Sequence, residues 1–337
     1  MSNNSRTIVE EILIPHSAFE KAAARIEQCF LFAEGKGETE GMAILGESGT
    51  GKTTVLKNFY AKHHFRHDEN GREVPVLFVS TPSAPTPKGL AGVMLTELGA
   101  ADAEQGTENY RTNRLKRLMK ETKTRMVIID EFQQFYDRGK RKVMHHAADW
   151  LKGLIDQTRT TLVIAGLPTA MTVIDSNEQL TRRFLAPIEL PRFSWTLERQ
   201  RIELQDILNA FYEAIASEFD LPNLASDEMA FRLYCATGGL MGYLSKLLKQ
   251  TLRNASIDKR RIITLEDFNI AHTEAIWSSQ RIAGLPLPFA SDFTPSETVD
   301  LLDAVGKIGT VQTSQEPARR PQTRKREQSV NELLKVR

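Results

Sequence analysis

The chain has 337 residues, of which 41% are hydrophobic and 26% are charged. This length and composition are typical of a globular protein with room for one large α/β domain and a smaller one. The 44 Lys and Arg residues nearly cancel the 43 Asp and Glu residues, which excludes a strongly basic or acidic protein, so any nucleic-acid contact depends on local clusters.

Residues 1–40 are expected to form an N-terminal helical segment. The first six residues are polar, and no run approaches the ~20 apolar residues of a membrane helix, so a cytoplasmic protein without membrane contact is expected. Apolar residues recur at helical spacing from Ser17 to Phe32, and Ser17 with Glu20 matches a capping box. Cys29 and Cys235 lie among apolar residues and are expected to be buried free thiols.

Residues 41–194 alternate between short apolar runs and helical patterns. Strands are expected at 42–45, 74–79, 126–129, 161–165 and 186–190, with helices at 53–64, 88–98, 110–123, 143–158 and 180–184. Such alternation predicts a parallel sheet with helices on both faces. Residues 195–285 show helical patterns only, and 286–337, rich in Pro, Ser, Thr and Arg, are expected to form a flexible basic tail.

A glycine-rich turn follows the first expected strand and matches the phosphate-loop pattern G-x-x-x-x-G-K-[ST]. Its glycines let backbone N–H groups surround phosphates, and the helix that starts there adds the positive end of its dipole. Lys52 is expected to contact the β- and γ-phosphates of ATP, and the Thr53 hydroxyl to bind Mg²⁺. The predicted nucleotide-binding residues here are Gly46, Glu47, Ser48, Gly49, Thr50, Gly51, Lys52, Thr53 and Thr54.

Two carboxylates, Asp130 and Glu131, end the third expected strand. Ligands of open α/β sheets bind at the carboxyl edge, so both side chains are expected beside the phosphate loop. Asp130 would hold Mg²⁺ through water, and Glu131 would orient the attacking water. The alternative is two solvated carboxylates at a strand end. Together with the helical second domain, these motifs predict an α/β fold of the P-loop AAA+ type, a three-layer parallel-sheet domain with a small all-helical lid.

Other parts of the predicted ATPase site are less complete. Arg183, with Arg182 as second choice, is the candidate to reach the γ-phosphate on a neighbouring subunit, although one of them could form a structural ion pair. The fourth strand ends in Gly166 without a polar side chain that could sense this phosphate. The lid has residues 238–242 where an arginine is common, and Lys246 is a possible substitute. Slow hydrolysis is therefore expected.

Basic residues follow Glu131 closely and could bind DNA phosphates in a central pore. The predicted DNA-binding residues are Arg138, Lys140, Arg141 and Lys142, together with Lys88 after the proline-rich loop. No base-reading motif is present, so sequence-nonspecific binding to double-stranded DNA is expected. The alternative interpretation is an ordinary solvated charge run.

The motifs taken together resemble those of the TniB/TnsC family of AAA+ transposition regulators, which are similar in role to MuB. The resemblance spans roughly residues 10 to 250. The segments that carry it are 46–53, Thr-Pro-Ser-Ala-Pro-Thr-Pro-Lys-Gly-Leu at 81–90, Ile-Asp-Glu-Phe-Gln at 129–133, Ile-Ala-Gly-Leu-Pro-Thr-Ala at 164–170 and Leu-Thr-Arg-Arg-Phe at 180–184.

This resemblance implies a homo-oligomer, a ring or helical filament, that assembles on duplex DNA with ATP and Mg²⁺. It also implies target-site marking, recruitment of a DDE transposase that stimulates hydrolysis, disassembly upon hydrolysis and, in some members, a TniQ-type adaptor linked to a CRISPR complex. Ile14, Pro15 and His16 would flank the adenine.

Three other functions are compatible with parts of this sequence. A replication initiator or helicase loader shares the fold, but many initiators carry a C-terminal winged helix, and residues after Ser279 are too short and proline-rich for one. A signalling ATPase would show no salt-dependent duplex binding. A protein-threading motor would be expected to carry an aromatic pore loop in place of the basic residues at 138–142.

Overall fold

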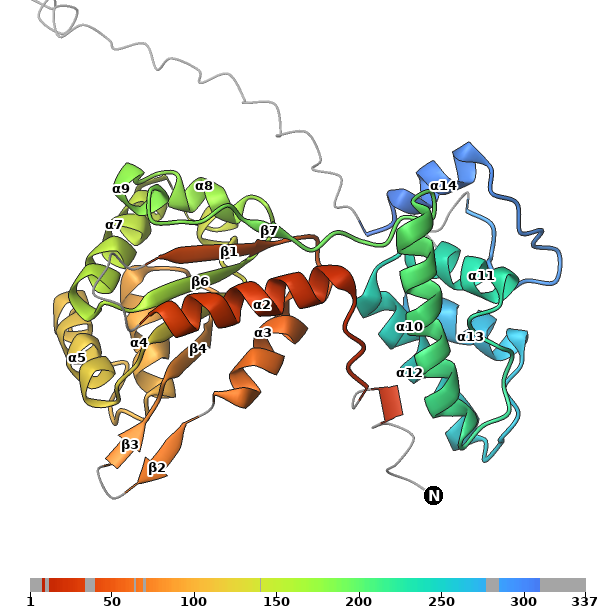
Figure 1. Cartoon of the computed structure of the whole chain (residues 1–337), viewed down its shortest axis with the longest axis horizontal. Helices are drawn as coiled ribbons and strands as arrows, with labels where there is room; N and C mark the ends of the chain where they lie inside the picture. Colours follow the sequence, from red (N-terminus) through yellow and green to blue (C-terminus); the bar gives the residue numbers. More distant parts are fainter. Residues whose placement is uncertain are drawn as a thin grey trace, which may run out of the picture.

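The computed structural model describes residues 8–9, 12–33, 40–63, 65–68, 71–139, 141–276 and 285–309. Figure 1 shows a domain built on a sheet beside an all-helical domain, with the carboxyl ends of the strands toward the helical one. Within the described part of the chain, no helix has the length and apolar character to cross a membrane.

Five parallel strands form the main sheet in the order β4-β5-β6-β1-β7. The strands are β1 (Gly41–Leu45), β4 (Val76–Ser80), β5 (Met126–Asp130), β6 (Thr161–Gly166) and β7 (Ile188–Glu189). The three central strands are buried along their whole length, which explains their nearly continuous apolar sequences. The register places Ser80 beside Asp130 and Leu45 beside Gly166, so these residues share the carboxyl edge.

Side chains of each strand alternate between two hydrophobic cores. In β1, Met42 and Ile44 pack under α2 (Ser17–Phe32) and α3 (Lys52–Lys62), whereas Ala43 and Leu45 face the opposite core. That second core is covered by α4 (Pro87–Glu97), α5 (Glu108–Glu121) and α7 (Arg141–Thr158). The predicted three-layer arrangement is therefore confirmed (Figure 1).

Several local details differ from expectation. Helix α2 has His16 as its N-cap without a side-chain hydrogen bond, so the capping box at Ser17 is wrong. A hairpin of β2 (Arg66–Asp68) and β3 (Gly71–Glu73) was not predicted, because its short polar strands have no apolar alternation. Short helices complete the domain: α6 (Gln134–Asp137), α8 (Ala170–Ile174) and α9 (Glu178–Thr181). Cys29 and Cys235 are buried free thiols, as predicted.

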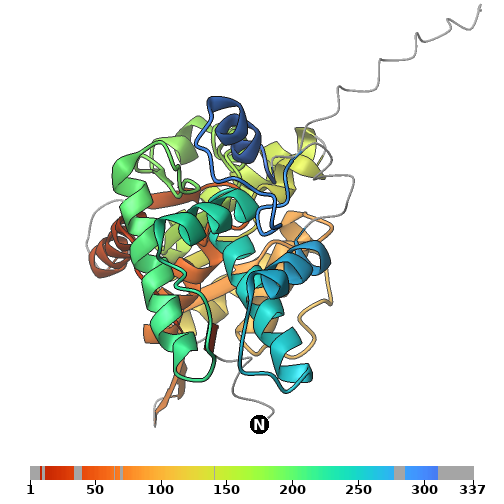
Figure 2. The ribbon, with the colours of Figure 1, turned by 90° about the vertical axis from the view of Figure 1, so that its right-hand side faces the viewer.

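The second domain contains only helices among its described elements (Figure 2). They are α10 (Glu198–Ala216), α11 (Asp227–Thr237), α12 (Met241–Ile257), α13 (Leu265–Ala275) and α14 (Val299–Gly306). Residues 286–309, expected in a flexible tail, instead pack on this domain, where Phe289 and Val305 are buried. The Arg232 guanidinium also donates to the Pro288 carbonyl at 2.6 Å. The prediction of a flexible tail did not take these apolar residues into account. The rest of that segment, residues 310–337, lies outside the described residues.

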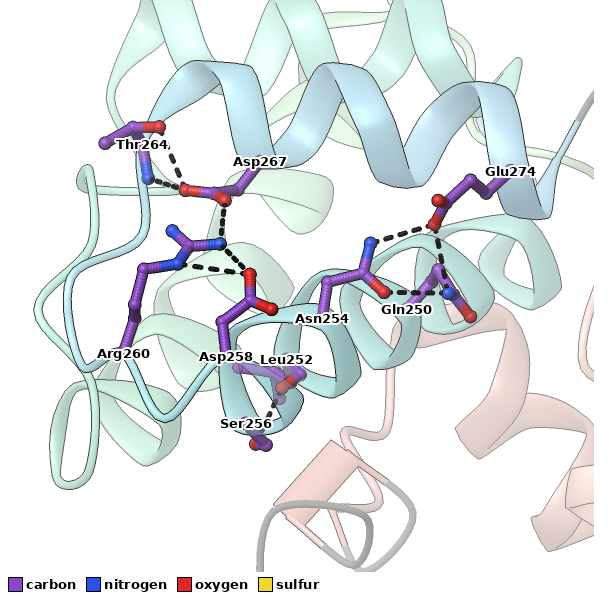
Figure 3. A network of polar contacts seen from close by, with 9 residues as sticks. All are labelled: Gln250, Leu252, Asn254, Ser256, Asp258, Arg260, Thr264, Asp267 and Glu274. Atoms are coloured by element: carbon purple, nitrogen blue, oxygen red, sulfur yellow. Dashed lines mark hydrogen bonds and ion pairs between the residues drawn. The ribbon is translucent and has the colours of Figure 1, made fainter.

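Helices α12 and α13 are joined by a polar network (Figure 3). Asp267 caps α13 by accepting from the Thr264 backbone N–H at 2.7 Å and from the Arg260 guanidinium at 2.7 Å. At the other end, Asn254 Nδ2 donates to Glu274 Oε2 at 2.8 Å. These contacts fix the helix that lies against the phosphate loop.

Candidate nucleotide site

The phosphate loop connects β1 to α3 in a conformation that needs glycine. Gly49 and Gly51 have φ angles of 86° and 96°. A side chain at Gly46 would place its Cβ 2.4 Å from the Leu190 carbonyl oxygen, so the backbone just after β7 also requires glycine there. The N–H groups at the start of α3 are thereby directed toward a common centre, as in an anion site at a helix N-terminus.

Lys52 lies at the first turn of α3, inside the loop. Its Nζ donates to the carbonyl oxygens of Gly46 at 2.8 Å and Glu47 at 2.7 Å. Burial lowers the pKa of Lys52, although nearby Glu131 and Asp130 oppose that shift. The ammonium is within reach of any phosphate held by the loop.

The Thr53 hydroxyl and the Asp130 carboxylate meet across the site. Thr53 Oγ1 donates to Asp130 Oδ2 at 2.6 Å, and the other carboxylate oxygen accepts the Glu131 N–H at 2.8 Å. Asp130 is buried at 3% exposure. Hydroxyl and carboxylate oxygens are the hard ligands that suit Mg²⁺, so this pair fits the expected metal.

Glu131 is held in place by a residue that the sequence analysis missed. Glu131 has a left-handed backbone (φ 56°), and its Oε2 accepts a hydrogen bond from Gln133 Nε2 at 2.6 Å. Gln133 Oε1 in turn accepts the Leu167 N–H at 3.3 Å. A Cβ at Gly166 would lie 2.4 Å from Gln133 Oε1. Gly166 thus leaves room for the Gln133 amide at the place where a polar strand residue was expected.

A cavity of about 640 Å³ lies between the two domains above the phosphate loop, a size typical of nucleotide and other ligand sites. Ser48 to Thr54 and Glu131 line it. Ile14 and His16 line it as well, whereas Pro15 is exposed and is not among the lining residues. Burial lowers the pKa of His16, which favours the neutral imidazole. The apolar N-terminal wall suits a planar base.

The helical domain closes this cavity directly onto the loop. The Gly242 N–H donates to the Gly49 carbonyl at 2.7 Å, and a Cβ at Gly242 would lie 2.9 Å from Gly49 Cα. Lys249 is among the lining residues of the cavity and Lys246 is not, so Lys249 is the better placed of the two lysines. The two residues are three positions apart on α12.

Arg192 joins the loop to the lid and was also missed. Its Nε donates to Glu47 Oε2 at 2.8 Å, and its Nη1 donates to the Gly238 carbonyl at 3.2 Å. Gly46 and Glu47 therefore shape the loop from outside the cavity rather than lining it. This tie was not visible in the sequence because 145 residues separate Glu47 from Arg192.

The two candidate arginines follow α9 and differ in their surroundings. Arg183 forms an ion pair with Asp156 of α7 at 2.8 Å, and its side chain is 19% exposed. Arg182 pairs with Glu178 one turn earlier on the surface, with 76% of its side chain exposed. Arg183, the first candidate, is thus paired within its own domain, whereas Arg182, the second candidate, is accessible.

Of the predicted DNA-binding cations that the structure describes, Lys88, Arg141 and Lys142 lie in the first turn of a helix, and Arg138 follows α6. Arg138 Nη1 donates to the Ser83 carbonyl at 3.0 Å, which brings the α6–α7 loop to the proline-rich loop. Lys88 is exposed in the first turn of α4, and Arg141 and Lys142 are exposed at the start of α7. Lys140 lies outside the described residues.

The parallel sheet, the phosphate loop and the helical domain define the fold of an AAA+ ATPase. Solved structures share this fold. The Aeropyrum pernix ORC2 protein (ADPNP–ADP complexes) has a TM-score of 0.60 at 15% identity, over 84% of this chain and 75% of that chain. CDC6P from Pyrobaculum aerophilum has a TM-score of 0.57 at 16% identity, over 90% and 83%. The Aeropyrum pernix ORC1 protein in complex with DNA gives 0.57 at 17% identity, over 80% and 69%.

Comparison with curated protein sequences gives no match. The family model described as Bacterial TniB protein matches residues 5–195. The chain belongs to the TniB family, which confirms the resemblance drawn from its motifs.

Proposed function

We propose that this protein hydrolyses ATP at the cavity between its domains. The observation that carries the proposal is the 2.6 Å contact between Thr53 and Asp130, with Glu131 facing the same cavity. Thr53 and Asp130 would hold Mg²⁺, which neutralises phosphate charge when bound. Lys52 would contact the phosphates, Ile14 and His16 the adenine, and Glu131 would accept a proton from the attacking water.

Gln133 would serve this reaction as a positioning residue. Its amide fixes one Glu131 oxygen while its own oxygen is held by the Leu167 N–H. The polar group missing from the end of β6 would thus be supplied by the β5–α6 turn. The Gln133 amide contacts both the Glu131 carboxylate and the backbone just after β6. A phosphate that contacts this backbone would therefore influence the position of Glu131.

Arg182 is the better candidate to complete the site of a neighbouring subunit. An exposed i,i+4 ion pair contributes little to stability, so Arg182 could leave Glu178 at small cost. Arg183 would have to give up its partly buried pair with Asp156. We therefore assign the trans role to Arg182 and a structural role to Arg183.

Duplex DNA would contact the carboxyl edge through Lys88, Arg138, Arg141 and Lys142. Cations in the first turn of a helix oppose the helix dipole, an unfavourable contribution of roughly 0.3–1 kcal/mol each. Phosphates at the same N-terminus are favourable, and they would neutralise these cations. The exposed basic starts of α4 and α7 therefore suit a phosphate backbone.

Membership of the TniB family supports a regulator of DNA transposition rather than a replication factor. In this proposal ATP joins adjacent subunits into a ring or filament on target DNA, the assembly recruits a DDE transposase, and hydrolysis dismantles it. A TniQ-type adaptor would select the site. The ORC-type neighbours share the fold at 15–17% identity, which leaves initiator function without specific support.

Two variants test this proposal in one set of assays. Lys52→Ala should abolish ATP-dependent binding to duplex DNA, because the phosphate contact is lost. Glu131→Gln should bind ATP but hydrolyse it at least ~100-fold more slowly, so its DNA complexes should persist. Wild-type hydrolysis by Glu131→Gln would contradict the role of Glu131, and salt-independent binding by the native chain would contradict phosphate contact.

A further inference from the structure

A second and larger cavity, of about 990 Å³, lies at the amino edge of the sheet. Its lining residues lie where α5 and α7 end and just before β5 and β6 begin, at the opposite end of these strands from the nucleotide cavity. Helix α7 runs 18 residues from the basic start at Arg141 to this cavity, about 27 Å at 1.5 Å per residue. The cavity is therefore separate from both the nucleotide site and the proposed DNA-binding edge.

Positive charge dominates the lining of this cavity. Its cationic residues are Arg66, Lys116, Arg117, Lys120, Lys123, Arg125 and Arg159, against the single lining carboxylate Glu73. Glu73 pairs with Lys123 at 3.5 Å, and Arg117 pairs with Glu121 on the rim at 3.7 Å. In the described part of the chain, no carboxylate pairs with Arg66, Lys116, Lys120 or Arg159. This excess of positive charge favours an anion at the cavity.

Two matching turns present cations to this cavity. In the turn before β5, the Thr122 hydroxyl donates to the Leu118 carbonyl at 2.8 Å and contacts the Thr124 hydroxyl at 3.0 Å. The turn before β6 repeats this arrangement, with Thr158 donating to the Leu154 carbonyl at 2.8 Å and contacting Thr160 at 2.8 Å. The residue between each threonine pair is a cation, Lys123 or Arg159.

Both central cations have left-handed backbones, with φ of 51° at Lys123 and 53° at Arg159. Glycine or asparagine would fit this position after a helix with less strain. Backbone strain of this kind clusters at functional sites. The repeated turn places both strained cations on the same side of adjacent parallel strands.

We propose that this cavity binds a phosphodiester backbone and forms a second nucleic-acid contact. Several flexible cations around one cavity match the regular charge of a nucleic-acid strand. An acidic peptide is a weaker fit, because the apolar lining residues Phe30 and Met119 are buried and offer little surface for side chains. The inference does not depend on ATP or on assembly.

The test uses glycine variants that separate binding from stability. In the full chain, Lys123→Gly with Arg159→Gly removes two cations and relieves backbone strain. We expect a higher melting temperature together with about tenfold weaker binding to fluorescent duplex DNA at 100 mM NaCl without nucleotide. The slope of log affinity against log salt should fall by about 1–2, because each lost phosphate contact contributes roughly 0.9.

Lys259 provides the matched control, because it is also a cation with a left-handed backbone (φ 55°) but lies on the helical domain. Lys259→Gly should raise the melting temperature and leave DNA affinity unchanged. A single-stranded probe of equal charge shows which strand form is preferred, and loss on either probe supports the proposal.

Three results would overturn the proposal. The double variant could bind both probes within twofold of wild type, the wild type could bind neither probe without nucleotide, or polyglutamate could compete as well as DNA at equal charge. Arg141→Ala with Lys142→Ala tests the carboxyl edge independently. If DNA affinity falls only in that variant and only in the presence of ATP, the second contact is contradicted and the proposed function is supported.

Discussion

At the residue scale, the side chains that we assign to ATP hydrolysis gather at the end of β5 and have a fixed geometry. Asp130 is anchored by the Thr53 hydroxyl and the Glu131 N–H, and Glu131 is anchored by Gln133. Each carboxylate therefore has a defined partner and a defined direction. Such preorganisation makes the reaction sensitive to residues that do not themselves touch substrate.

Gln133→Ala should slow ATP hydrolysis roughly 10–100-fold while nucleotide affinity changes less than about twofold. The expected cause is loss of the 2.6 Å hydrogen bond that orients Glu131. Steady-state kinetics and titration with a fluorescent nucleotide measure the two effects. Gln105→Ala, which removes an exposed glutamine bonded to Asp102, should change neither. Equal losses of rate and affinity after Gln133→Ala would mean that the residue only supports the loop.

Arg182 and Arg183 should respond differently to alanine. Arg183→Ala breaks a partly buried ion pair with Asp156 and should lower the free energy of unfolding by about 1–3 kcal/mol. Arg182→Ala should change that free energy by less than about 0.5 kcal/mol, because its pair with Glu178 is exposed. It should nevertheless reduce DNA-stimulated hydrolysis at least ~100-fold. Urea unfolding measures the two changes in stability, and ATPase assays measure the change in hydrolysis. Normal hydrolysis by Arg182→Ala would show that Arg182 is not part of the active site.

At the element scale, the start of α12 determines how closely the helical domain meets the phosphate loop. The Gly242 N–H bonds to Gly49, while Arg192 links Glu47 to the Gly238 carbonyl. Nucleotide bound by the loop would therefore act on α12, which Figure 3 shows joined to α13 by a polar network. In the proposed function, this contact would couple nucleotide binding to the orientation of the helical domain.

Gly242→Ala should weaken nucleotide binding about tenfold or more, because backbone atoms of Gly49 leave no room for a methyl group. Gly153→Ala is the matched control, since no atom lies within 4 Å of its added Cβ. That control should raise helix stability by roughly 0.5–1 kcal/mol and leave affinity unchanged. Calorimetric titration with an ATP analogue measures both variants, and undiminished affinity in Gly242→Ala would argue against close packing of α12 on the loop.

The Asp267 network should make the helical domain sensitive to acid. Burial alone would raise the pKa of Asp267, but hydrogen bonds from Arg260 and Thr264 outweigh burial and lower it. Its stabilising contribution is therefore complete above the unfolded pKa of about 3.9 and is lost as pH falls through the lower folded pKa.

Asp267→Asn should accordingly lower the free energy of unfolding by about 1–3 kcal/mol at pH 6. The decrease should be smaller at pH 3. Asp258→Asn, at a more exposed partner of Arg260, should show a smaller effect at pH 6. Chemical denaturation at the two pH values provides the comparison. An Asp267→Asn deficit that is equal at both pH values would show that charge is not the source of the stabilisation.

At the scale of the whole molecule, sequence predicted what depends on local patterns. Apolar runs located the strands of the main sheet, and the motifs correctly placed the phosphate loop, Asp130 and Glu131 together at one edge of it. Contacts between distant segments were not predictable. Gln133 serves Glu131 because Gly166, 33 residues away, has no side chain, and Arg192 reaches Glu47 only in the folded chain. The polar hairpin β2–β3 had no apolar signal to reveal it.

The complete arrangement leaves a cavity between the two domains, which we assign to nucleotide, and Arg182 is exposed, as its proposed role toward a neighbouring copy requires. Sedimentation of the full chain with duplex DNA and Mg²⁺, with and without a non-hydrolysable ATP analogue, directly measures nucleotide-dependent assembly on DNA. Large protein–DNA assemblies should form only with the analogue and should dissolve as salt is raised. A chain that stays monomeric and unbound to DNA in both samples would contradict the proposed function.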